Sequence, residues 1–307
     1  MIRYLLLLII ILSPTNNFLL TKLNAEGEET FLDNGREKIK NNNFSGAIND
    51  FNKYLKINPQ SWRAYHNKAF SKEKLGDFNG AIKDYSKAIE LSEKPWVKTY
   101  FGRAFSKAEI KDYFGAIEDY SKVIELDPND FLAFYNRGLA KFNLKDFKGS
   151  IEDFSSTLNL NDKYENAFFN RAYIKAELKD FKGAIDDYSR LIKLNPKDDI
   201  AFHNRGLAKE NLGDYQGAIS DYSEALEIND EYFSAYFNRA YIKAELKDYK
   251  GAINDYSKAL ILEPDYLIAF FNRGLAKEDL EDYQGAISDY SEVLKINNKY
   301  EDAYYQR

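Results

Sequence analysis

A six-residue motif recurs along the chain at an almost fixed spacing. It reads Gly, then Ala or Ser, then Ile, any residue, Asp, and Phe or Tyr. Its glycines are Gly46, Gly80, Gly115, Gly149, Gly183, Gly217, Gly251 and Gly285. The spacing is 34 residues, except for 35 residues between the second and third copies, where the extra residue falls in segment 92–98. A fixed period of this length predicts an array of stacked helical repeats.

The stretch 165–198 shows what one repeat encodes. Each of its halves carries apolar residues at helical spacing, which predicts two amphipathic helices joined by a short turn. Asp180 stands where it would cap the second helix, and an Asp or Asn stands at the equivalent place in every repeat. Pro196 is placed to end that helix.

The composition excludes several classes of function. The chain has no Cys, which rules out disulfides, thiolate metal sites and Cys nucleophiles. A net charge of −6 with interleaved acids argues against a nucleic-acid-binding surface. The two histidines, His66 and His203, lie four repeats apart, and the sequence lacks an HExxH zinc motif, a phosphate loop and a G-x-S-x-G elbow. We therefore expect no enzymatic activity, no metal site and no cofactor.

The repeats resemble the tetratricopeptide repeat (TPR) family. With a repeat numbered 1 to 34 from Glu165, the small residues of that family at positions 8, 20 and 27 correspond to Ala172, Ala184 and Leu191. Its aromatic residues at positions 4, 17 and 24 correspond to Phe168, Phe181 and Tyr188. The resemblance implies an all-α fold, a right-handed superhelical solenoid of helix-turn-helix units.

Eight tandem repeats are expected within residues 28–300. Their ranges are 28–61, 62–96, 97–130, 131–164, 165–198, 199–232, 233–266 and 267–300. Residues 301–307 match the start of a further first helix. From residue 102 onward the repeats alternate between two patterns, so any groove is expected to repeat every 68 residues.

The first 25 residues differ from the repeats. Arg3 is followed by nine apolar residues, and Ala25 stands before an acidic stretch, which is the pattern of a secretory signal peptide. The apolar run is too short to cross a bilayer as a helix. A secreted, periplasmic or cell-envelope protein is expected. The alternatives are an uncleaved membrane tether, which would be the only membrane contact, and a soluble N-terminus.

Position 6 of the repeat is usually Asn, and position 5 is usually aromatic. The resemblance implies that positions 5, 6 and 9 face the concave groove of the solenoid, where a row of amides would hold an extended peptide backbone. The alternative is that these Asn residues bond between repeats as part of the scaffold. The predicted peptide-binding residues are Asn67, Asn136, Asn170, Asn204, Asn238, Asn272, Phe101, Tyr135, Phe169, Phe237, Phe271, Tyr173 and Tyr241.

Charged residues recur at positions 7, 11 and 23. The family more often has apolar or aromatic residues at these places. Because the three depart together, we expect two cations on the first helix to pair with an Asp on the second. The alternative is a site for an acidic ligand. The predicted structural ladder consists of Arg137, Arg171, Arg205, Arg239, Lys141, Lys175, Lys209, Lys243, Asp153, Asp187, Asp221 and Asp255.

Two functions follow from these patterns. The first is a non-catalytic scaffold or adaptor that binds an extended peptide or a partner protein in the concave groove. The second is a structural protein that assembles with other copies through its repeat ends. The acidic charge and the recurring Asp disfavour a third reading, an RNA-binding helical array.

Overall fold

The structure is a computed structural model that describes residues 30–94 and 96–307. The predicted signal peptide at residues 1–25 lies outside the described residues and stays a prediction. The chain divides into two compact halves, Met1–Asp153 and Phe154–Arg307. The boundary falls within helix α8 (Phe147–Leu160), and each half is described by itself.

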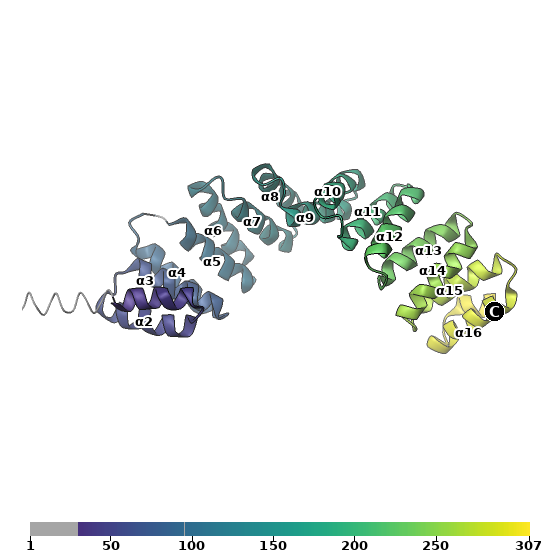
Figure 1. Cartoon of the computed structure of the whole chain (residues 1–307), viewed down its shortest axis with the longest axis horizontal. Coiled ribbons are helices and arrows are strands. Elements are labelled where there is room, and N and C mark those ends of the chain that lie inside the picture. Colours follow the sequence, from purple (N-terminus) through teal and green to yellow (C-terminus); the bar gives the residue numbers. More distant parts are fainter. Residues whose placement is uncertain (1–29, 95) are drawn as a thin grey trace, which may run out of the picture. The chain divides into compact units, whose positions relative to one another are not determined.

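Helices alternate along both halves (Figure 1), and the described residues contain no strand. The first helices of the successive repeats are 30–40, α3 (Trp62–Lys74), α5 (Val97–Glu109), α7 (Phe131–Asn143), α9 (Glu165–Glu177), α11 (Asp199–Asn211), α13 (Phe233–Glu245) and α15 (Leu267–Glu278). The second helices are α2 (Phe44–Ile57), α4 (Phe78–Leu91), α6 (Tyr113–Leu126), α8 (Phe147–Leu160), α10 (Phe181–Leu194), α12 (Tyr215–Ile228), α14 (Tyr249–Leu262) and α16 (Tyr283–Ile296). The short helix α17 (Glu301–Gln306) follows.

The recurring motif sets the start of each second helix. In α10 the Asp180 carboxylate accepts a hydrogen bond of 3.0 Å from the backbone N–H of Gly183, which satisfies an N–H that the helix leaves free. A Cβ atom on Gly183 would collide with that carboxylate. The absence of a Cβ atom at Gly183 lets the carboxylate lie directly against the backbone in this cap.

Neighbouring helices pack in sequence order. Within each half, a helix pair packs against the next repeat, and consecutive first helices also touch, as α3 and α5 do in the first half and α13 and α15 in the second. The core is formed by alanines and by the ring at position 24, such as Tyr120 in the first half and Tyr256 in the second, both about fully buried. The prediction of an all-α solenoid of helix-turn-helix units is confirmed.

The turn between the two helices of a repeat contains one residue with positive φ. It is a lysine in several repeats, as at Lys247 with φ of 63°, and a glycine at Gly76 and Gly213. A side chain in this left-handed conformation costs about 1–2 kcal/mol, whereas glycine has no such cost.

We therefore expect Lys247→Gly to raise the free energy of unfolding by up to about 1 kcal/mol, once the entropy that glycine adds to the unfolded chain is subtracted. Lys250→Gly is the matched control, because Lys250 lies inside α14. It should lower the free energy of unfolding by about 0.5–1 kcal/mol. Urea unfolding followed by circular dichroism measures both, and two losses of equal size would contradict the role of the turn.

Candidate functional site

In each described repeat that has cations at positions 7 and 11 and an Asp at position 23, both cations form ion pairs with that Asp. In the fifth repeat, Arg171 donates two hydrogen bonds to the Asp187 carboxylate, of 2.9 and 2.6 Å. Lys175 donates to the same carboxylate at 2.7 Å. Asp187 is only 2% exposed, so its charge depends on these two partners. The same geometry recurs at Arg137, Lys141 and Asp153, at Arg205, Lys209 and Asp221, and at Arg239, Lys243 and Asp255.

The arginine of this ladder also joins consecutive repeats. The third donor of Arg171 bonds the hydroxyl of Ser155, in the second helix of the preceding repeat, at 2.9 Å. Arg239 does the same with Ser223 at 2.8 Å. The predicted ladder residues therefore do lie together. Their ion pairs connect the two helices of one repeat, and the arginine also bonds the preceding repeat. Because Arg171 and Lys175 both bond Asp187 and are largely buried, they do not present an open surface to an acidic ligand.

The position-6 asparagines have protein partners. Burial raises the pKa of Tyr188, Tyr222 and Tyr256, and the side chains of Asn204, Asn238 and Asn272 respectively oppose that rise. The Asn238 side-chain nitrogen also lies 3.1 Å from Nε2 of His203, and the Asn136 side chain donates to the Leu132 carbonyl at 2.8 Å. These bonds belong to the scaffold. A role of the amides in holding a peptide stays a prediction, since an Asn side chain has capacity for further hydrogen bonds.

The predicted groove aromatics fall into two groups. At position 5, Phe169 packs edge-on against Tyr188, the core tyrosine of its own repeat, with 6.0 Å between ring centroids. Phe101 and Phe237 pack in the same manner on their core tyrosines, and the Phe271 ring is tilted at 48° on Tyr290. Those at position 9, Tyr173 and Tyr241, are 42% and 45% exposed. Only the second group offers a largely open ring to a partner.

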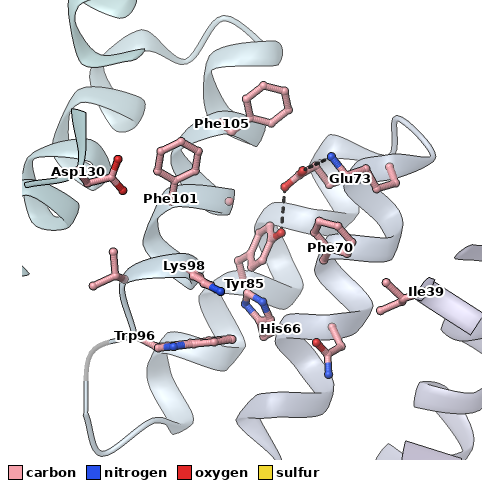
Figure 2. Close-up of a pocket in the computed structure, with 14 residues that line it drawn as sticks. Ile39, His66, Phe70, Glu73, Tyr85, Trp96, Lys98, Phe101, Phe105 and Asp130 are labelled. Atoms are coloured by element: carbon pink, nitrogen blue, oxygen red, sulfur yellow. Dashed lines mark hydrogen bonds and ion pairs between the residues drawn. The ribbon is translucent and has the colours of Figure 1, made fainter. Parts of the chain in front are cut away.

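An aromatic-walled recess lies in the first half, between helices α3 and α5. We call it the apolar recess. Its volume is about 560 Å³. Figure 2 shows Phe70 on one side and Phe101 and Phe105 on the other, with the Tyr85 and His66 rings between them. The predicted groove residues Asn67 and Phe101 both line it.

Two departures from the repeat pattern create this recess. The first is Gly102, which stands at position 6 where most repeats have Asn. It leaves space that the Tyr85 ring partly fills, and a Cβ atom at residue 102 would collide with that ring. The second is the additional residue in segment 92–98, a segment that also contains Trp96. The Trp96 ring lines the recess and packs against His66 at 4.3 Å and against Trp62 at 5.2 Å between centroids.

The charged groups of the apolar recess are balanced. Glu73 and Asp130 are acidic, and Lys74 and Lys98 are basic. Glu73 accepts a hydrogen bond of 2.9 Å from the Tyr85 hydroxyl and lies 3.6 Å from the Lys74 ammonium group. Burial raises the pKa of Glu73 above its ordinary value, and those two contacts oppose the rise. The walls are mostly aromatic carbon, so the recess suits an uncharged apolar group better than an ion.

His66 is a pH-sensitive part of this recess. Its imidazole is 8% exposed and bonds the Thr99 hydroxyl at 3.1 Å. Burial, followed by the positive charge of Lys98, lowers its pKa to about 4. The folded chain therefore holds His66 neutral at pH values where the unfolded chain protonates it.

The free energy of unfolding is therefore expected to fall by about 3 kcal/mol through this group as the pH falls from about 6.5 to about 4. The loss is absent above that range, because His66 is neutral in both states there. In His66→Phe the chain should lose less stability over the same pH range, since position 5 is Phe in other repeats. Urea unfolding at several pH values measures the slope. Equal slopes in the two proteins would refute the assignment.

Residues 30–94 and 96–307 contain neither a metal-binding cluster nor a membrane-spanning helix. No group of three or more His, Asp or Glu side chains there is arranged to hold a metal ion. Among the helices of this described part, none is both long enough and apolar enough to cross a membrane.

Comparisons with known proteins found one family repeatedly. A model described as "TPR repeat" matches residues 108–145 and 241–281. Two models described as "Tetratricopeptide repeat" match residues 200–232 and residues 63–95, 165–198 and 268–300. The search of curated proteins found no match.

Several solved structures share the fold. The C-terminal part of a TPR repeat-containing protein from Cytophaga hutchinsonii is 19% identical, with a TM-score of 0.71 over 78% of this chain and 97% of that one. YrrB, described as a TPR protein with an unusual peptide-binding site, is 17% identical, with a TM-score of 0.56 over 62% and 97%. MamA from Desulfovibrio magneticus RS-1 is 19% identical, with a TM-score of 0.53 over 57% and 99%. At these identities the likeness shows the fold alone.

Proposed function

This chain belongs to the tetratricopeptide repeat family, whose repeats serve as scaffolds for protein–protein interaction, and we propose that it binds an extended segment of a partner protein. The segment would lie along the first helices of the repeats. In the first half, a bulky apolar side chain of that segment would enter the apolar recess.

One observation carries this proposal: the apolar recess is a departure from a pattern that the other repeats follow. Here Gly102 stands in place of Asn, and the connection before α5 is one residue longer and carries the larger ring of Trp96. Together these residues open a cavity of about 560 Å³ with aromatic walls. Clefts of roughly 300–1,000 Å³ with apolar walls and a few polar groups are typical of binding sites.

The expected affinity rests mainly on the apolar anchor. Burial of a Phe or Leu side chain contributes about 1.5–3 kcal/mol, which corresponds to roughly 10–100-fold in affinity. A neutral hydrogen bond contributes about 1 kcal/mol, against an association cost of about 4–15 kcal/mol. Amide contacts along the first helices would then set the direction of the segment, while the anchor would decide whether it binds.

We expect a random 12-residue peptide library, selected on the full chain, to enrich Phe, Trp, Leu or Ile at one position. In Phe105→Ala, which removes one wall of the recess, that enrichment should disappear. Phe114→Ala is the matched control, because the Phe114 ring is 73% exposed on α6 and lies outside the recess. If Phe105→Ala keeps the enrichment, the recess is not the anchor site.

A further inference from the structure

A second recess lies in the other half of the chain, between the first helices α13 and α15. Its volume is about 320 Å³, and its walls include the rings of Tyr241, Tyr249 and Tyr256. The predicted groove residues Tyr241 and Asn272 both line it. We call it the acidic recess, because its charges differ from those of the apolar recess.

Two acids and one base border the acidic recess. Glu245 is the last residue of α13 and Asp279 caps the end of α15, while Lys247 lies in the turn after α13. Within the described residues, neither Glu245 nor Asp279 forms a salt bridge with a basic side chain. Tyr241 and Glu245 lie four residues apart on α13 and both line the recess, so the carboxylate adjoins the exposed ring, and its charge raises the pKa of the Tyr241 hydroxyl.

The ends of the helices add to this negative potential. Both α13 and α15 terminate at the recess, and the carbonyl groups at a helix C-terminus carry a partial negative charge that favours cations. The apolar recess differs on this point, because Lys74 occupies the last position of α3 and lies 5.1 Å from the centroid of the Phe70 ring. The acidic recess therefore presents the exposed Tyr241 ring and two carboxylates to a cation from outside.

We propose that the acidic recess binds a lysine or arginine side chain of the partner segment, an inference that rests on the proposed function and specifies its ligand. The aliphatic part of that side chain would lie against Tyr241 and Leu275, and its charged end between Glu245 and Asp279. Cations over aromatic faces contribute more when they are partly desolvated. The chain itself uses this pairing close by, where Lys258 lies 5.3 Å from the centroid of the Tyr236 ring.

The recess has a sequence counterpart 68 residues earlier. Tyr173, Glu177, Tyr188 and Asn204 repeat the residue types of Tyr241, Glu245, Tyr256 and Asn272. They belong to α9, α10 and α11 of the same half, arranged in the same order. Asn211 replaces the acid at position 279, so this counterpart carries one carboxylate fewer. A partner with two basic residues would thus engage a stronger and a weaker site.

The test uses two small probes, N-acetyl-arginine amide and N-acetyl-norleucine amide, titrated into the full chain. The Tyr241 ring signals are followed by NMR and assigned with Tyr241→Phe. We expect the arginine probe to shift these signals saturably and the norleucine probe to leave them unchanged. The double variant Glu245→Gln, Asp279→Asn should bind the arginine probe about tenfold more weakly.

The control is Glu227→Gln, Asp230→Asn, which changes the net charge by the same amount at two exposed acids outside the recess. It should bind as the parent chain does. An equal response to norleucine, an equal loss in the control, or no shift at Tyr241 would each overturn the inference. These probes carry no apolar anchor, so the result is independent of whether a peptide uses the apolar recess.

Discussion

Asp187→Ala is expected to lower the free energy of unfolding by about 3–5 kcal/mol, because it leaves two cations close together with no counter-charge in a partly buried site. Arg171 and Lys175 are only 15% and 19% exposed and both bond this carboxylate. The loss should be concentrated in the fifth repeat and its neighbours, since the repeats of an array interact mainly with adjacent repeats. Hydrogen exchange of the α9 and α10 amides, together with urea unfolding, measures it.

The control for this variant is the adjacent acid. Asp186 is exposed on the same helix and forms no ion pair within the described residues, so Asp186→Ala should change stability by less than about 0.5 kcal/mol. If the two alanine variants behave alike, the ladder is not a structural element of the array. A surface ion pair would give a difference of at most about 1 kcal/mol.

Gly102→Asn is expected to weaken binding of the library-selected peptides by about 10–100-fold, because its side chain fills the apolar recess. The variant should still fold. Elsewhere in the array an Asn at this position is accommodated beside the position-24 tyrosine, as Asn272 is beside Tyr256, so Tyr85 has an arrangement to adopt. Helical circular dichroism checks the fold, and fluorescence anisotropy with a labelled peptide measures the affinity.

The matched glycine is Gly76, in the turn between α3 and α4. Its φ is 79°, a conformation in which Asn is tolerated, and a Cβ atom there would meet nothing within 4 Å. Gly76→Asn should therefore bind the peptide as the parent chain does. Full affinity in Gly102→Asn, with helical content retained, would show that the partner does not enter the recess.

Much of the fold can be predicted from the sequence because each repeat carries the same helix and capping signals. The 34-residue period fixes the pairs of helices, and Asp180 with Gly183 marks the start of a second helix through a cap that depends on no distant residue. The cations and the acid were expected to meet, because all three depart together from the family pattern. Their contacts, such as Arg171 with Asp187, have the expected partners.

The candidate site was less accessible to sequence reasoning. Ser155 was missed as a partner of Arg171, although a serine recurs at its position in most repeats. In the sequence, Gly102 is distinguished only as one of the residues that interrupt the row of asparagines at position 6. A missing side chain opens a cavity only if its neighbours do not close it, and this depends on how Tyr85 and Trp96 pack across two repeats. Such packing is a tertiary property that a repeat pattern does not encode.

The most direct test of the apolar anchor uses the chain's own tryptophans. There are two, Trp62 and Trp96, and Trp96 lines the recess, so Trp62→Phe leaves a single reporter inside the candidate site. Titration with a library-selected peptide that lacks tryptophan should change the Trp96 emission until it saturates. The dissociation constant from this titration should equal the one measured by fluorescence anisotropy. A peptide that binds by anisotropy but leaves the Trp96 emission unchanged would contradict the account.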